Sequence, residues 1–315
     1  MSVIGTRLIV PGSLFALCSF ATIALAADPP ASQPAASQPT LQPTLDLLAS
    51  TGKVMHIRPR YVRLGVDEGV ELAERNYHHA YLDWQLPLDQ CALVLLDVWN
   101  YHYSKDTFER VDSISRNQIP KALAACRAQG MQVIHAPASP VATRHPNWLR
   151  LVDDKTRRSP YPNSPDWPPA EFKSKQGPYA KLRRPTEAHE AYSSYHAKNL
   201  RDFHEACRPV GNEPVILSGE ELHRLCAQRA ILHLFYVGFN TNACMLYRTY
   251  GIMQMTGRGY SCILLRDATT GMETAETQPT MACTNGIIAT LEQFGNYTVS
   301  TDELVQSLKQ AKTGG

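Results

Sequence analysis

The sequence predicts a three-layer α/β/α fold with a mainly parallel, Rossmann-like sheet. After residue 90, short runs of apolar residues alternate with segments whose apolar residues recur at helical spacing. The short runs show no polar face, which is typical of strands that helices cover on both sides. The chain has 315 residues, of which 43% are hydrophobic and 19% charged, so it can bury the core of a globular protein.

Each element is predicted from its own run of residues. The helix predicted over residues 118–129 stops at Gly130. The helix that starts at Ser218 has Glu221 at capping-box spacing, and Gly257 and Gly259 end the helix that follows the fourth strand. The predicted strands span residues 92–97, 131–136, 215–217, 231–237, 260–265 and 297–299. The predicted helices span residues 118–129, 218–229, 243–256 and 273–294, and a last one begins at Thr301.

Two regions do not follow this alternation. Residues 137–213 are rich in Pro, Tyr, Arg, Lys and His and are longer than an ordinary connection, so we expect an insertion that crosses the strand ends. Residues 45–90 contain alternating apolar residues that are compatible with a strand or a hairpin. Their pattern does not give them a place in the sheet.

The N-terminal residues 1–27 are predicted to be a secretory signal peptide. Arg7 precedes a mostly apolar stretch that ends in the cleavage site Ala24-Leu25-Ala26, and an uncleaved membrane anchor is the alternative. Residues 28–44 are rich in Pro, Ala, Ser and Gln, so we expect a linker to a domain over residues 45–315. The mature protein is therefore predicted to be periplasmic or secreted, without stable membrane insertion.

Charge and cysteine usage narrow the choice of partners and cofactors. The formal net charge is +2 and the basic residues are not interleaved with aromatic ones, so we expect a small-molecule substrate and no nucleic acid. No Cys-x-x-Cys or Cys/His ligand spacing is present, and we expect neither a metal nor another cofactor. The cysteines after the signal are expected to be buried thiols, with Cys244 as the exception.

Cys244 stands where an apolar run stops and a helical pattern begins. A thiol at the start of a helix lies near free backbone N–H groups, which favour the thiolate and can bind a developing oxyanion. Far upstream, Asp97 ends another apolar run. Because the carboxyl ends of parallel strands open onto the same edge, we expect the two side chains to meet there. An ordinary buried cysteine and a helix-capping aspartate are the alternatives.

Two motifs give the chain a family resemblance. The segment FYVGFNTNAC over residues 235–244, with GYSCILLRDATT over residues 259–270 and Asp97, resembles the isochorismatase-like cysteine hydrolases, which include nicotinamidases and N-carbamoylsarcosine amidohydrolase. The likeness extends over about residues 88–300. It implies that Cys244 is the nucleophile and Asp97 the general base. It also implies a cis peptide between Phe239 and Asn240, an oxyanion hole made by the Asn240 and Cys244 amides, and assembly into a homo-oligomer.

The chain departs from the family pattern in three places. The family lysine after the third strand is absent from VILSGEEL over residues 215–222, where Ser218 holds the approximate place. Trp99 stands where the family often has glutamine, although Asn100 is kept. The Asp-x-His metal pair of nicotinamidases is absent from residues 135–145, so the metal-free expectation stands.

A substrate pocket is expected around the strand ends. Trp99 and Tyr103 either form an aromatic wall or pack under the insertion, and His135 either lines the pocket or bonds a loop. The full predicted set is Trp99, Asn100, Tyr103, His135 and Phe239.

The predicted function is that of an exported cysteine hydrolase which cleaves a C–N bond of a small molecule through a Cys244 thioester. Two alternatives remain open. The missing lysine is compatible with a noncatalytic protein that keeps the pocket for a small ligand. An isochorismatase-type ether hydrolase would use acid catalysis without a thioester.

Overall fold

The computed structural model describes residues 52–153, 168–185 and 201–313, which belong to one compact unit of the chain. The predicted signal peptide (1–27) and linker (28–44) lie outside the described residues, as do two parts of the predicted insertion. None of the described helices combines the length and the apolar character that a membrane span needs.

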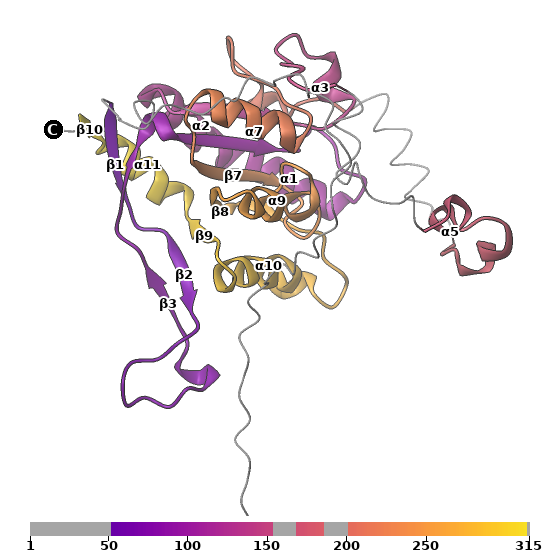
Figure 1. Ribbon diagram of the computed structural model, residues 1–315, viewed down its shortest axis with the longest axis horizontal. Coiled ribbons are helices and arrows are strands. Elements are labelled where there is room, and N and C mark those ends of the chain that lie inside the picture. Colours follow the sequence, from indigo (N-terminus) through magenta and orange to yellow (C-terminus); the bar gives the residue numbers. More distant parts are fainter. Residues whose placement is uncertain (1–51, 154–167, 186–200, 314–315) are drawn as a thin grey trace, which may run out of the picture. The chain divides into compact units, whose positions relative to one another are not determined.

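A seven-stranded sheet of order β3-β2-β9-β8-β7-β5-β6 forms the centre of the molecule (Figure 1). Its five central strands pair in parallel, and β2 and β3 add an antiparallel edge. The strands are β2 (Arg60–Arg63), β3 (His78–Tyr81), β5 (Cys91–Leu96), β6 (Gln132–Ala136), β7 (His233–Phe239), β8 (Ser261–Thr270) and β9 (Tyr297–Val299). The predicted mainly parallel sheet is confirmed.

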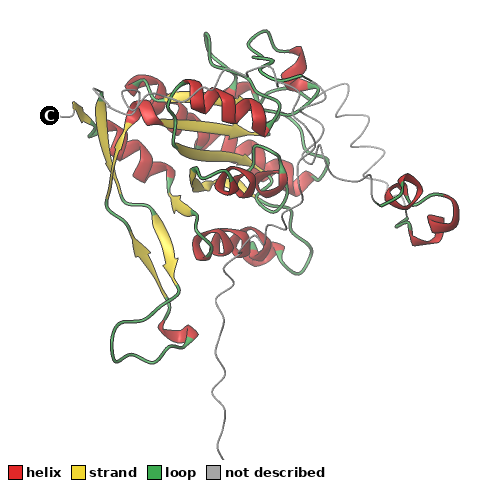
Figure 2. Ribbon diagram, viewed as in Figure 1, coloured by secondary structure: helices red, strands yellow, loops and turns green. Residues whose placement is uncertain are grey.

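Helices cover both faces of the sheet, as Figure 2 shows. The side chains of β5 alternate between two buried clusters, with Leu93 and Leu95 in one and Val94 and Leu96 in the other. The first cluster contains residues of α1 (Lys105–Asn117), α2 (Ile119–Gln129) and α11 (Thr301–Lys309). The second contains residues of α7 (Gly219–Gln228), α9 (Ile252–Gly257) and α10 (Ala282–Gln293). Because both faces are buried, the central strands are apolar throughout, and the three-layer α/β/α prediction is confirmed.

The region before residue 90 contributes strands that the sequence pattern could not place. β1 (Lys53–Ile57) pairs antiparallel with β4 (Trp84–Pro87) and with β10 (Lys312–Thr313) in a separate three-stranded sheet. Met55, Ile57 and Leu86 join the core cluster under α2 and α11. This small sheet therefore closes one end of the core, while β2 and β3 extend the main sheet.

Two predicted elements are shorter than expected. Residues 215–217 form no strand, because Val215 makes only isolated bridges to His135 and Trp148. The helix predicted over residues 273–294 begins at Ala282, where the Glu273 carboxylate accepts the backbone N–H groups of the first turn. The short elements η6 (Gln278–Thr280), η5 (Glu205–Cys207), η4 (Gly177–Leu182), η3 (Leu88–Gln90), η2 (Glu74–Asn76), α3 (Val141–Arg144) and α5 (Ala170–Ser174) complete the described helices.

The helix predicted over residues 243–256 is broken in the middle. It forms α8 (Cys244–Tyr247) and α9, and Arg248 between them has an extended backbone with ψ of 147°. The carbonyl of Tyr250 accepts a hydrogen bond of 2.9 Å from the buried Tyr236 hydroxyl. A side chain at Gly251 would come within 2.8 Å of the Met245 carbonyl oxygen. Tertiary contacts therefore override the helical spacing, and the prediction of one continuous helix is wrong.

Gly238, near the end of β7, is a strict glycine position. Its φ is 126°, and a Cβ there would lie 1.9 Å from the Leu96 carbonyl oxygen of the neighbouring strand. We predict that Gly238→Ala lowers the free energy of unfolding by about 2–5 kcal/mol, because backbone strain and steric overlap add. Urea unfolding followed by circular dichroism measures the change.

Gly257 provides the control. It is exposed at the end of α9 with open space around its Cα, so Gly257→Ala should change the stability by less than about 1 kcal/mol. Equal stability of the two variants would contradict the close approach of β5 and β7.

Candidate active site

Asp97 and Cys244 lie together at the carboxyl edge of the sheet. Asp97 follows β5, Cys244 begins α8 soon after β7, and these two strands are parallel neighbours with Leu96 opposite Gly238. Each of these two side chains shifts the pKa of the other, which places the Cys244 thiol close to the Asp97 carboxylate. The structure thus brings together the two residues that the sequence nominates as base and nucleophile.

The loop that carries Cys244 is fastened to the end of β8. The Thr241 amide donates to the Thr270 carbonyl at 3.0 Å, and the Thr241 and Thr269 hydroxyls lie 2.7 Å apart. Asn242 exchanges two hydrogen bonds with the backbone of Met272, at 2.7 and 3.0 Å. The segment before Cys244 and the segment at the end of β8 are therefore hydrogen-bonded to each other. These bonds hold the candidate nucleophile in position.

The amides expected to form the oxyanion hole lie between the end of β7 and the start of α8. The peptide between Phe239 and Asn240 is cis, as the resemblance implies. The Asn240 backbone amide acts to lower the pKa of Cys244. The Cys244 N–H is the first of α8 and has no acceptor within that helix. The oxyanion hole formed by these two amides stays a prediction.

Two further side chains hold the Asp97 carboxylate. Arg248 donates from Nε to Oδ2 at 2.9 Å, and the Tyr250 hydroxyl donates to Oδ1 at 3.2 Å. The Asp97 side chain is fully buried, whereas that of Arg248 is 36% exposed. Burial raises the pKa of Asp97, and the positive charge of Arg248 opposes this rise. The guanidinium therefore favours the ionised carboxylate that a general base requires.

The pKa of the Cys244 thiol is raised in this arrangement. Burial and the adjacent Asp97 carboxylate both raise the pKa of Cys244, and Arg248 only partly offsets them. These surroundings oppose the thiolate that the helix start was expected to favour. The helix α8 has only four residues and supplies little dipole, while the charge of Asp97 raises the pKa of the thiol.

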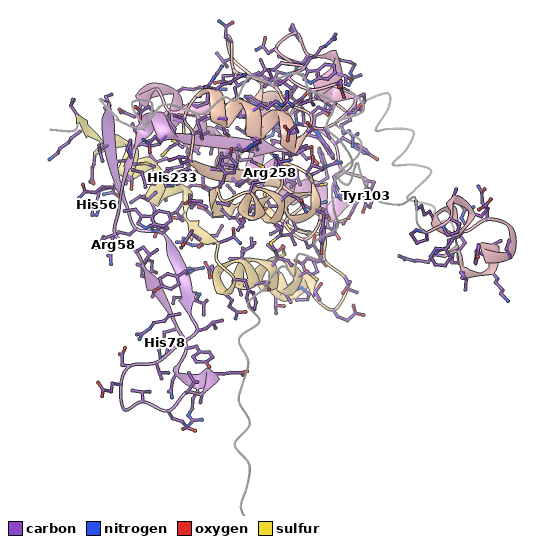
Figure 3. The ribbon with its side chains drawn as sticks, viewed as in Figure 1. His56, Arg58, His78, Tyr103, His233 and Arg258 are labelled. Atoms are coloured by element: carbon purple, nitrogen blue, oxygen red, sulfur yellow. The ribbon has the colours of Figure 1, made fainter. Side chains whose placement is uncertain are left out.

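Tyr103 and Trp99 lie close to this pair. The Tyr103 hydroxyl donates to the Met272 sulfur at 2.7 Å, its ring stacks on His102, and burial and Cys244 raise its pKa (Figure 3). The Trp99 indole donates to the Pro137 carbonyl at 2.7 Å. The Arg201 guanidinium lies over the Trp99 ring, 4.0 Å from its centroid. Trp99 therefore packs under residue 201, which is one of its two expected roles, and the aromatic wall stays a prediction.

Three predicted pocket residues have other contacts. Phe239 is 4% exposed and belongs to the hydrophobic core with Val98 and Val237, so its side chain does not line a pocket. His135 is 1% exposed and its Nε2 lies 2.8 Å from a Glu213 carboxylate oxygen, which is the loop-bonding alternative. Asn100 uses its side-chain oxygen to accept the Asp202 amide at 2.8 Å. Phe239 thus packs in the core, and His135 and Asn100 bond to Glu213 and Asp202.

Four residues at the site were not recognised in the sequence. Arg248 and Tyr250 were assigned to a continuous helix, although their spacing of four and six residues from Cys244 places them near it. His102 Nε2 accepts a hydrogen bond of 3.1 Å from the Asn240 side-chain amide nitrogen. Arg201 follows a long polar segment, and the sequence pattern of that segment does not indicate that Arg201 lies near the site. Among the described residues, no cluster of three or more His, Cys, Asp or Glu side chains is arranged to hold a metal ion.

Comparison with known proteins finds a family model and several similar structures. A family model described as an isochorismatase domain matches residues 91–303. The fold is similar to a cysteine hydrolase from Pseudomonas syringae pv. phaseolicola 1448A, with 18% identity and a TM-score of 0.47 over 72% of this chain and 95% of that one. It is also similar to N-carbamoylsarcosine amidase from Thermoplasma acidophilum, with 13% identity and a TM-score of 0.37 over 68% and 97%.

No curated protein matches the chain. The family model nevertheless covers more than half of the residues, including Asp97, Cys244 and both motifs around them. The chain therefore belongs to the isochorismatase family.

Proposed function

We propose that this protein is a hydrolase that cleaves a C–N bond of a small amide through a thioester on Cys244. The position of the Cys244 thiol near the buried Asp97 carboxylate, at the adjacent ends of β5 and β7, carries the proposal. A carboxylate in contact with a protonated thiol can accept its proton during attack on a carbonyl carbon. We also propose that the chain is exported, on the basis of residues 1–27, which lie outside the described residues.

The proposed reaction has two halves. Cys244 Sγ bonds to the carbonyl carbon while its proton moves to Asp97, and the Asn240 and Cys244 amides donate to the oxyanion. The C–N bond then breaks, and the leaving nitrogen takes the proton from Asp97. In the second half, Asp97 removes a proton from water, which attacks the thioester. The acid leaves, and the proton returns from Asp97 to the Cys244 thiolate.

Arg248 supplies the positive charge in this proposal, in place of the family lysine that the sequence lacks. Its Nε contacts Asp97 directly at 2.9 Å. An arginine stays protonated, so it stabilises the ionised carboxylate without exchanging a proton itself. Asp97 therefore carries out every proton transfer, and Arg248 adjusts how readily it accepts one.

Replacement of the two central residues tests the reaction. We predict that Cys244→Ala and Asp97→Asn each lower kcat on an amide panel by about 10³-fold or more, because each removes a chemical step. Intact-protein mass spectrometry should detect an acyl adduct on the wild type and none on Cys244→Ala. Cys283→Ser is the control, since Cys283 is the other partly exposed described cysteine and lies in α10.

The outcomes separate the candidate functions. Unchanged turnover by Cys244→Ala would contradict the thioester and favour an ether hydrolase. No turnover by the wild type on any amide, together with tight binding of a small ligand, would favour the noncatalytic alternative.

The role of Arg248 is tested by the pH dependence of kcat/KM. Activity requires ionised Asp97, so it falls as the pH drops through the pKa of this group. Arg248 lowers that pKa, and Arg248→Gln should therefore move the acid limb to higher pH, whereas Arg248→Lys should move it less. Arg258→Gln is the control, because Arg258 pairs with Glu220 at the surface. An acid limb that stays in place in Arg248→Gln would contradict the assigned role.

A further inference from the structure

A cavity of about 450 Å³ next to residue 201 is lined by three arginines. Arg144, Arg201 and Arg208 line it, and Asp202 is the one carboxylate in its described lining. A cavity of this size is within the range of small-molecule sites. The net charge of this lining is positive, so the cavity favours an anionic ligand.

Two of these guanidiniums lack a carboxylate partner. Arg208 forms a salt bridge of 3.0 Å with Asp202. Arg144 donates to the Arg201 carbonyl at 2.6 Å, and Arg201 donates to the Ser139 carbonyl at 3.0 Å. The Nε of Arg201 is buried without a hydrogen-bond partner. Within the described part of the chain, neither Arg144 nor Arg201 forms a salt bridge, so positive charge is left uncompensated at the cavity.

Arg201 connects the cavity with the candidate active site. Its segment pairs with the residues that follow Asp97, because the His204 amide donates to the Val98 carbonyl and the Asn100 amide to the Asp202 carbonyl, both at 3.1 Å. The Arg201 guanidinium lies over the Trp99 ring, and the charges of Asp97 and Cys244 act to raise its pKa. Arg201 therefore belongs both to the lining of the cavity and to the electrostatic surroundings of the Asp97–Cys244 pair.

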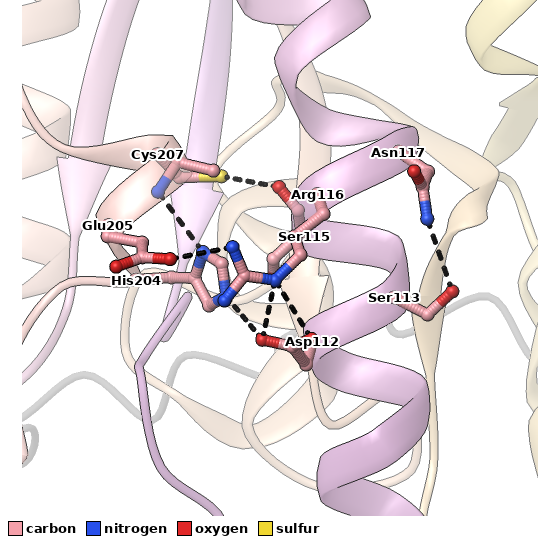
Figure 4. Close-up of polar contacts among 9 residues, drawn as sticks. Asp112, Ser113, Ser115, Arg116, Asn117, His204, Glu205 and Cys207 are labelled. Atoms are coloured by element: carbon pink, nitrogen blue, oxygen red, sulfur yellow. Dashed lines mark hydrogen bonds and ion pairs between the residues drawn. The ribbon is translucent and has the colours of Figure 1, made fainter.

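The segment that carries Arg201 and Arg208 is held in place by α1. Figure 4 shows His204 and Arg116 both bonded to Asp112, and Arg116 also bonded to Glu205. The Cys207 thiol donates to the Ser115 carbonyl at 3.3 Å. Because these contacts surround η5, Arg201 and Arg208 are placed before any ligand arrives, which lowers the entropy cost of binding.

We propose that this cavity is a subsite for an anionic carboxylate or phosphate group of the substrate whose C–N bond is cleaved at Cys244. The assignment to substrate rests on the proposed function. Guanidinium groups suit this ligand, because they donate two parallel hydrogen bonds to a carboxylate or phosphate. The substrate class is therefore a small amide with an anionic group at its far end.

A matched pair of amides tests the subsite by activity. Succinamate and butyramide have the same chain length, but only succinamate carries a carboxylate. We expect kcat/KM to be higher for succinamate, and Arg144→Gln to lower the succinamate-to-butyramide ratio about tenfold or more, because a charge-assisted hydrogen bond is lost. Arg224→Gln is the control, since Arg224 pairs with Glu220 on α7. An unchanged ratio in Arg144→Gln overturns the proposal.

Calorimetry provides a readout that does not require turnover. Succinate and inorganic phosphate are titrated into Cys244→Ser, with and without Arg144→Gln. Succinate binding that Arg144→Gln weakens at least tenfold supports the subsite, even if the wild type cleaves neither amide, a result that would count against the hydrolase instead. Absence of binding by both anions overturns the subsite. Phosphate that binds without competing against succinamate also overturns it, because the cavity would then be separate from the substrate.

Discussion

The burial of the Asp97 carboxylate is the constraint on which the rest of the site depends. An isolated buried carboxylate costs several kcal/mol unless partners compensate its charge. Here Arg248 and Tyr250 both donate to it. Arg248 and Tyr250 reach it because the chain between α8 and α9 leaves the helical path. The same compensation holds a base beside a thiol, so the stability of the sheet edge and its proposed chemistry have one origin.

Much of the fold could be predicted because the central strands are buried on both faces. Runs such as residues 92–97 show this burial directly, and the motif around Cys244 located the nucleophile candidate. The partners of Asp97 could not be predicted, since helical spacing over residues 243–256 does not register a hydrogen bond from Tyr236 to the Tyr250 carbonyl. Likewise, alternating residues in β1 do not reveal that its partners are β4 and β10. Local sequence patterns predict where helices and strands occur. Long-range contacts decide where each one ends and which element it packs against.

The site and the arginine-lined cavity share one stretch of backbone. Residues after Asp97 pair with the segment from Arg201 to His204, and α1 fastens that segment through Asp112. Trp99, which departs from the family pattern, packs against Arg201, because the guanidinium lies over its ring. The absent lysine is likewise matched by a cation at another position, Arg248. Arg248 and Arg201 therefore both place positive charge near Asp97.

The central claim is that Asp97 is ionised and Cys244 protonated before substrate binds. Infrared difference spectroscopy of wild type against Cys244→Ala at neutral pH tests it most directly, because the S–H stretch reports a protonated thiol and its hydrogen bonding. The account predicts an S–H band that Cys244→Ala removes and Asp97→Asn shifts in frequency. A difference spectrum without any S–H band from Cys244 would show a resting thiolate and contradict the account.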